Sequence, residues 1–379
     1  MKTLKAIKAL NAMKTAQLAL LGGACWLASC SSTPKMVATP PKAVRTYNGT
    51  ASVGDFLTIS IDSIALTITY RNYTNGETGT VPYTINSDGT YTISDPNGNL
   101  LSAYEVPGTA LLVEAANAGP LQNTDALITA IESTPSTINT FAGRSFNYLQ
   151  FRTAAGGLEM GTITIDAQAN IQHDGYWPFG AFQQPQRLFG GGSFPASSVV
   201  EDASGNFFTV NESGGSSDVV FGTQNGFFAV DTGNGTILSL PKGGRNFAPS
   251  SAGTYTALFY EKVNAQTGQG NVESGTAVEG KATVTISASG VVNIADSHSN
   301  TLAGGTLVPV ADASYIYDGT QNTLSDPCFG MFTFRTTANS QQDVFVTFQG
   351  NAVVFASFQT ALPIANYAPY TYFYGVGLK

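Results

Sequence analysis

Hydrophobic and polar residues alternate with a period of two along most of the chain after residue 47. The alternation is clearest at 56–61, 65–70, 162–165 and 283–286, where Thr, Ile, Val, Tyr and Phe recur. This period, with β-branched and aromatic residues, is typical of strands that bury one face. The segment 125–132 fits a short helix or a strand equally well.

Turn dipeptides separate these strands at short intervals. Asn, Asp and Gly tolerate the positive φ angles that tight hairpin turns need. Regular short strands with such turns predict an all-β protein, built from two or three antiparallel sandwich-like or barrel-like units in tandem. The dipeptides are Asn75-Gly76, Asp88-Gly89, Asn97-Gly98, Asp174-Gly175, Asn225-Gly226, Ser289-Gly290, Asp318-Gly319 and Gly350-Asn351.

An internal echo supports a division into units. Gly, Thr, Ile and Asn positions of 79–101 recur in 280–302, and a looser copy lies at 161–171. Convergence of common turn patterns is the alternative to a true repeat. We interpret the body as β units at 44–136, 137–246 (with an aromatic insertion at 173–194) and 247–379.

The first thirty residues indicate export. Lysines precede an apolar run that is too short to span the ~30 Å hydrocarbon core of a bilayer, and the run ends in small residues. Leu27-Ala28-Ser29-Cys30 resembles the lipobox of bacterial lipoprotein precursors, in which an aliphatic residue and two small residues precede a cysteine. An ordinary secretory signal with an incidental Cys30 is the alternative.

The lipobox resemblance implies a processing route and a location. It implies cleavage between Ser29 and Cys30, removal of 1–29 as a signal peptide, and acylation of Cys30. Two or three fatty chains anchor a protein stably to a membrane. Residues 30–43 then form the lipidated cysteine and a flexible tether containing Pro34, Pro40 and Pro41. Ser31, rather than Asp, favours the outer membrane in a cell with two membranes.

Composition and charge exclude several classes of protein and of binding partner. Only 11% of the 379 residues are charged, whereas 42% are hydrophobic, which excludes a coiled coil and an acid-rich disordered chain. Without the lysine-rich leader, 13 basic and 25 acidic residues give the body a net charge of −12. Such a body repels nucleic acid, and we expect no nucleic-acid partner.

The residues that could carry catalysis are few. His173 and His298 are the only histidines, and no G-x-S-x-G nucleophile elbow accompanies them. Asp231-Thr232-Gly233 is half of an aspartic-protease signature, but with Asn234-Gly235 behind it a turn is the simpler interpretation. Cys328, the one thiol left in the mature body, fits a packing role. We therefore predict no catalytic residues, no metal site and no cofactor.

Two other stretches are candidates for binding. Asp95–Asn99 and Asp202–Asn206 distantly suggest calcium loops, although turns built on Asp side chains explain them better. In the aromatic insertion, Tyr176, Trp177 and Phe179 could stack on a sugar ring, or they could fold back onto the core.

The sequence thus predicts a non-catalytic cell-envelope lipoprotein of structural, adhesive or interaction type. Its expected partners are the membrane, through the lipid on Cys30, and a glycan or an envelope protein. A glycan-binding module that uses the 173–194 loop is the main alternative. An envelope hydrolase with an unrecognised site is a further one.

Overall fold

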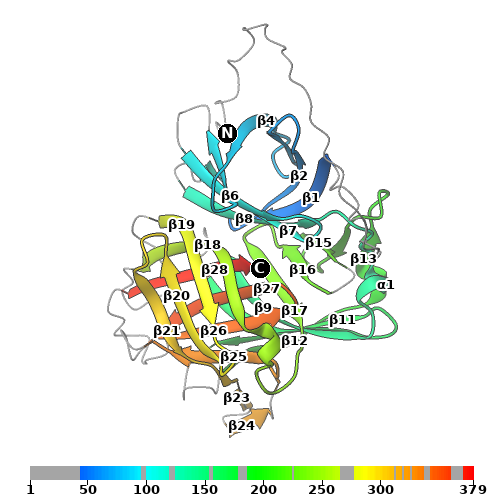
Figure 1. The fold of residues 1–379 in the computed structure, drawn as a ribbon. Helices are drawn as coiled ribbons and strands as arrows, with labels where there is room; N and C mark the ends of the chain where they lie inside the picture. Colours follow the sequence, from blue (N-terminus) through cyan, green and yellow to red (C-terminus); the bar gives the residue numbers. More distant parts are fainter. Residues whose placement is uncertain are drawn as a thin grey trace, which may run out of the picture.

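The computed structural model is almost entirely β, as the alternation predicts (Figure 1). Its one α-helix, α1 (Ile138–Phe141), and two 3-10 turns, η1 (Ala196–Ser198) and η2 (Pro249–Ser251), are short. No helix in the described residues has the length and apolarity to cross a membrane. The structure describes residues 43–94, 100–118, 124–152, 157–177, 186–223, 226–264, 277–310, 313–317, 320–324, 327–336, 342–359 and 370–379.

The first sheet is a closed antiparallel barrel of eight strands in chain order. The barrel closes because β8 pairs with β1, from Tyr47↔Glu132 to Ala51↔Ile128. The segment that fits a helix or a strand in the sequence, 125–132, is therefore a strand. The strands are β1 (Val44–Ala51), β2 (Asp55–Asp62), β3 (Thr67–Asn72), β4 (Thr78–Ile85), β5 (Tyr91–Ser94), β6 (Leu100–Val106), β7 (Ala110–Ala118) and β8 (Thr124–Glu132).

The second sheet is also an antiparallel meander in which the last strand, β17, pairs with the first, β9. The hairpin β23 (Ala313–Tyr317) and β24 (Thr320–Leu324) joins this sheet through a parallel contact with β12, so the boundary predicted at 246/247 does not separate the two sheets. The other strands are β9 (Arg144–Arg152), β10 (Gly157–Ile165), β11 (Ile171–Trp177), β12 (Gln186–Phe194), β13 (Val199–Glu201), β14 (Phe208–Asn211), β15 (Ser217–Gly222), β16 (Phe228–Asp231) and β17 (Thr236–Pro241).

The third sheet has nine strands, and its last strand in the chain, β28, likewise pairs with its first, β18. The three sheets make three antiparallel barrel-like units in tandem. The strands of the third are β18 (Gly253–Asn264), β19 (Ala277–Ile286), β20 (Val291–Asp296), β21 (Thr301–Thr306), β22 (Val308–Pro309), β25 (Met331–Arg335), β26 (Gln342–Gln349), β27 (Ala352–Gln359) and β28 (Tyr370–Leu378).

One turn geometry explains the internal echo. In 86–90, 166–170 and 287–291 the first residue's amide bonds to the fifth residue's carbonyl, and the fourth residue's amide bonds to the first residue's carbonyl. The fourth residue has a positive φ in each turn. The hairpin turn at 212–216, which lies outside the echo, uses the same pattern. This common turn accounts for the matched glycines, Gly89 and Gly290.

One predicted turn is instead part of a strand. Asp174-Gly175 lies within β11, where the pairing with β12 shifts register on both sides of Gly175. Glycine accommodates such β-bulges, which sharpen the local twist of a strand. The dipeptide signal is therefore a bulge signal at this position.

Four hydrophobic cores hold the units together. Three of them fill the interiors of the individual units. The fourth lies between the units and draws buried side chains from all three, including Leu112 and Leu127, Phe151, and Val354. In it the rings of Phe151 and Tyr374 stack at 4.9 Å. Cys328 is fully buried in this shared core, as its predicted packing role requires.

A buried ionic cluster lies inside the first barrel. The Arg45 guanidinium donates to both carboxylate oxygens of Glu105, at 2.5 and 2.7 Å, and the hydroxyls of Tyr47 and Tyr91 donate to the same carboxylate. Burial raises the pKa of Glu105, but these hydrogen bonds outweigh it and leave the pKa below its ordinary value. Each member compensates the desolvation of the others, so the cluster is internally satisfied.

A second buried acid lies where the first unit meets the second. Asp231, at the end of β16, is 4% exposed, and its Oδ1 accepts the Gly233 amide at 3.2 Å. Nearby, the hydroxyls of Thr50 and Thr236 join the two units by a 2.9 Å hydrogen bond. Burial raises the pKa of Asp231 to about 7, and the charge of Asp55 adds to this increase.

We predict that Asp231→Asn removes a loss of stability that occurs between about pH 4 and pH 7. The folded pKa lies above the unfolded one, so stability is complete below about pH 4 and falls as pH rises toward 7. From pH 5 to pH 8 the wild-type protein should lose about 3 kcal/mol that the variant keeps. Urea unfolding at both pH values measures the difference. The matched control is Glu201→Gln, at an exposed acid on β13; an identical pH response of Asp231→Asn and wild type would contradict the assignment.

Candidate ligand cavity in the second unit

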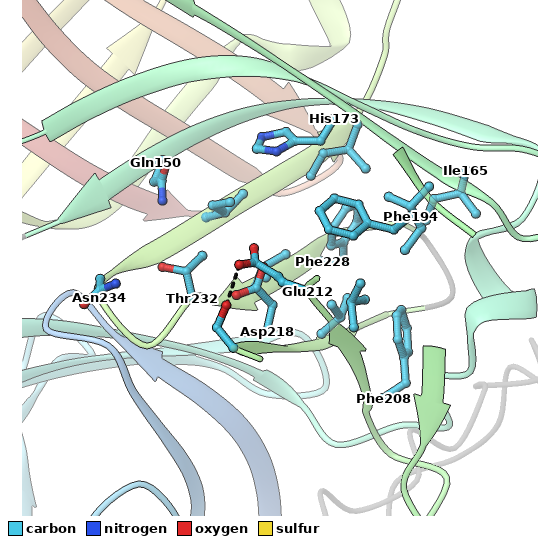
Figure 2. Close-up of a pocket in the computed structure, with 17 residues that line it drawn as sticks. Gln150, Ile165, His173, Phe194, Phe208, Glu212, Asp218, Phe228, Thr232 and Asn234 are labelled. Carbon is cyan, nitrogen blue, oxygen red and sulfur yellow. Dashed lines mark hydrogen bonds between the residues drawn. The ribbon is translucent and has the colours of Figure 1, made fainter. Parts of the chain in front are cut away.

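The interior of the second unit contains a cavity of about 260 Å³. Figure 2 shows side chains from both halves of the sheet directed into it. They alternate along their strands, because every second residue of a strand faces the interior. On β14 and the following turn these are Phe208, Val210 and Glu212, and on β15 they include Asp218 and Val220.

One end of this interior is apolar and closed. Phe141 of α1 is fully buried, with its ring centroid 5.3 Å from that of Phe228 and 6.2 Å from that of Phe208. Phe146 completes the group by an edge-on contact with Phe228 at 4.5 Å. The short helix therefore acts as an aromatic plug, which the strand pattern of the sequence did not predict.

The other end is polar and reaches solvent. Glu212 and Asp218 are half-buried, and Ser216, in the turn between β14 and β15, is exposed. The Ser216 hydroxyl donates to Glu212 Oε2. Across the cavity, Thr232 and Asn234 of the β16–β17 turn extend the polar rim. The cavity is thus an amphipathic cup with two carboxylates near its mouth.

His173 lines the cavity from β11, and a hydrogen bond to Tyr148 holds its imidazole in place. Its Nε2 lies 2.7 Å from the Tyr148 hydroxyl, which donates to Glu159 Oε1. Since the phenol proton is used toward Glu159, the Nε2 atom must carry the proton that bonds to the Tyr148 oxygen. This chain fixes the orientation of the imidazole at the cavity wall.

Gly161 makes room for this chain. It pairs with Tyr148 on β9 and with Gly175 on β11. A Cβ at this position would overlap both the Tyr148 ring and the Asp174 carbonyl oxygen. The absence of a side chain therefore lets the buried Tyr148 ring lie across the strand and reach His173.

The other residues singled out from the sequence are placed as follows. Asp231-Thr232-Gly233 is a turn, with Gly233 at φ +69°. Asp202 lies in a turn, where its Oδ2 accepts the Ser204 amide at 2.7 Å, and His298 is exposed in another turn. Among the described residues no three His, Cys, Asp or Glu side chains gather as they would around a metal.

The aromatic insertion proves to be a strand pair, β11 and β12. Tyr176 is only 2% exposed and belongs to the shared core, so it is not part of a surface platform. Trp177 ends β11 and its side chain is not described, while Phe179 lies outside the described residues. Ser29, Cys30, the tether and Asp95–Asn99 also lie outside them.

Comparisons with known proteins give no family. No family model and no curated protein matches the chain. Among solved structures, a putative DNA polymerase III β subunit from Eubacterium rectale aligns over 70% of this chain and 91% of its own, with 8% identity and a TM-score of 0.11. At that TM-score the likeness carries no argument about fold or function.

We predict that Gly161→Ala destabilises the second unit through the Tyr148–His173 contact. Overpacking of a well-packed interior costs about 1–3 kcal/mol, and here the backbone carbonyl of Asp174 cannot move aside easily. Urea unfolding measures the loss. Gly214→Ala is the control, because a Cβ at Gly214 meets nothing within 4 Å. Equal stability of the two variants would show that Gly161 is not a packing position.

Proposed function

We propose that this protein is a non-catalytic lipoprotein of the cell envelope, anchored through acylated Cys30, that acts by binding. The observation that carries the binding part is the amphipathic cavity of the second unit. The lipobox-like Leu27-Ala28-Ser29-Cys30 carries the anchoring part. The envelope location, in the outer membrane of a two-membrane cell, belongs to the same proposal.

The cavity's polar groups are arranged for contact rather than for turnover. A general base needs to reach its reacting group, and a nucleophile needs a base within hydrogen-bond distance. The His173 Nε2 is turned toward the buried Tyr148 hydroxyl instead. The Ser216 hydroxyl, in an exposed turn, donates to Glu212 and not to His173, so these two residues do not form a serine–imidazole pair. This geometry favours binding over hydrolysis.

The surface where the chain enters the first barrel supports contact with a membrane. Ala43 precedes β1, and its carbonyl accepts the Ser63 amide at 2.9 Å, so the end of the tether lies beside the β2–β3 turn. That turn exposes Ile64 by 81% and Leu66 by 39%. Apolar side chains beside a lipid tether can lie at the headgroup boundary, where their burial adds to anchoring.

We predict that Cys30→Ala releases the protein from membranes. Intact mass of the membrane-extracted wild type should begin at Cys30 and carry the added acyl chains, and metabolic palmitate should label it. Cys25→Ala is the control, because Cys25 lies in the segment removed as the signal. An unlabelled wild type, or a Cys30→Ala protein that stays with the membrane fraction, would overturn the anchoring proposal.

A further inference from the structure

We infer that the cavity of the second unit takes a small apolar compound bearing a positively charged amine. The inference rests on the proposed binding function and gives it a ligand class. It stands on one juxtaposition: buried aromatic rings on the inner wall, and two carboxylates, Glu212 and Asp218, at the mouth.

The volume sets the size of the ligand. An apolar cavity of about 150 Å³ holds benzene, so about 260 Å³ has room for roughly ten non-hydrogen atoms. A peptide or an oligosaccharide is too large for this interior, whereas an aryl or short alkyl amine fits it.

The inner wall selects an apolar body. Phe208 and Phe228 lie next to the plug residue Phe141, and Ile163, Val210 and Val230 continue the wall. All six are buried, with exposed fractions of at most 6%. Placing an aromatic ring or an alkyl chain here removes its surface from water, at a gain of about 25 cal/mol per Å².

The mouth selects a positive charge. Figure 2 shows the carboxylates of Glu212 and Asp218 side by side and directed into the cavity. Among the described residues that line the cavity, His173 is the one basic side chain, and its Nε2 is committed to Tyr148. Hydrogen bonds between an ammonium and a carboxylate are stronger than those between neutral groups. An anionic ligand would instead be repelled, since the body carries a net charge of −12.

The test compares three probes of matched shape on the lipid-anchored protein in nanodiscs. The probes are 2-phenylethylammonium, 2-phenylethanol and phenylacetate, each close to ten non-hydrogen atoms. Calorimetric titration, with empty nanodiscs as the blank, measures saturable binding. We expect the ammonium probe to bind at least about tenfold more tightly than the alcohol, and phenylacetate to bind most weakly.

Two variants separate the charge from the shape. Glu212→Gln combined with Asp218→Asn should lower the affinity for the ammonium probe by about tenfold or more. The affinity for the alcohol should stay within about twofold of the wild-type value. Val230→Phe, which fills the interior, should weaken both probes. Glu201→Gln is the matched control, because this exposed acid lies on β13 of the same sheet and does not line the cavity.

The outcomes distinguish this inference from the proposed function. The ligand class is overturned if the ammonium probe binds no more tightly than the alcohol. It is also overturned if the double variant binds the ammonium probe as tightly as the wild type does. Failure of all three probes on a protein whose mass shows acylated Cys30 overturns the inference and leaves the anchoring in place. Binding by a protein that proves unacylated overturns the anchoring alone.

Discussion

Burial of the three units against one another is the constraint on which the rest of the structure depends. Each barrel-like sheet has an interior, but it also turns apolar side chains outward into the shared core. Leu112 and Leu127 come from the first unit, Phe151 and Leu238 from the second, and Val354 from the third. Single barrels could each bury one face only. The shared core fixes the units to one another and so keeps the second unit's cavity in a defined frame.

This double burial explains which sequence predictions succeeded. In strands with one solvent-facing side, such as 56–61, hydrophobic and polar residues alternate clearly, and the sequence predicts them correctly as strands. Strands buried on both faces lose the alternation and read as continuous apolar runs, as 227–230 and 353–356 do. Tyr176 is a residue whose burial the sequence pattern left open. An aromatic residue beside turn-forming Gly175 resembles a surface loop, whereas the bulge directs it into the shared core.

The site itself could be predicted only in part. Sequence reasoning noticed His173 but had no means of joining it to Tyr148 and Glu159, since their contact depends on the register of three neighbouring strands. Gly161, opposite Tyr148, was the available signal, because a glycine within a strand often marks a close approach. No motif in the sequence marks the acids Glu212 and Asp218 as cavity residues. Only the sheet's curvature brings them over the aromatic floor.

The retained cavity is itself an argument for binding. Proteins pack their interiors to crystal-like density, and empty apolar volume costs about 24 cal/mol per Å³. The interior of the first unit holds the Arg45–Glu105 cluster and the tilted ring pair of Tyr83 and Tyr91, and the third unit packs the rings of Phe332 and Phe348 together. In the second unit the cavity lies above the buried rings of Phe208 and Phe228, and Glu212, Asp218 and Thr232 add polar groups to its wall. The proposed binding function rests on this volume, because a cavity that combines buried rings with carboxylates offers a ligand both apolar and charged contacts.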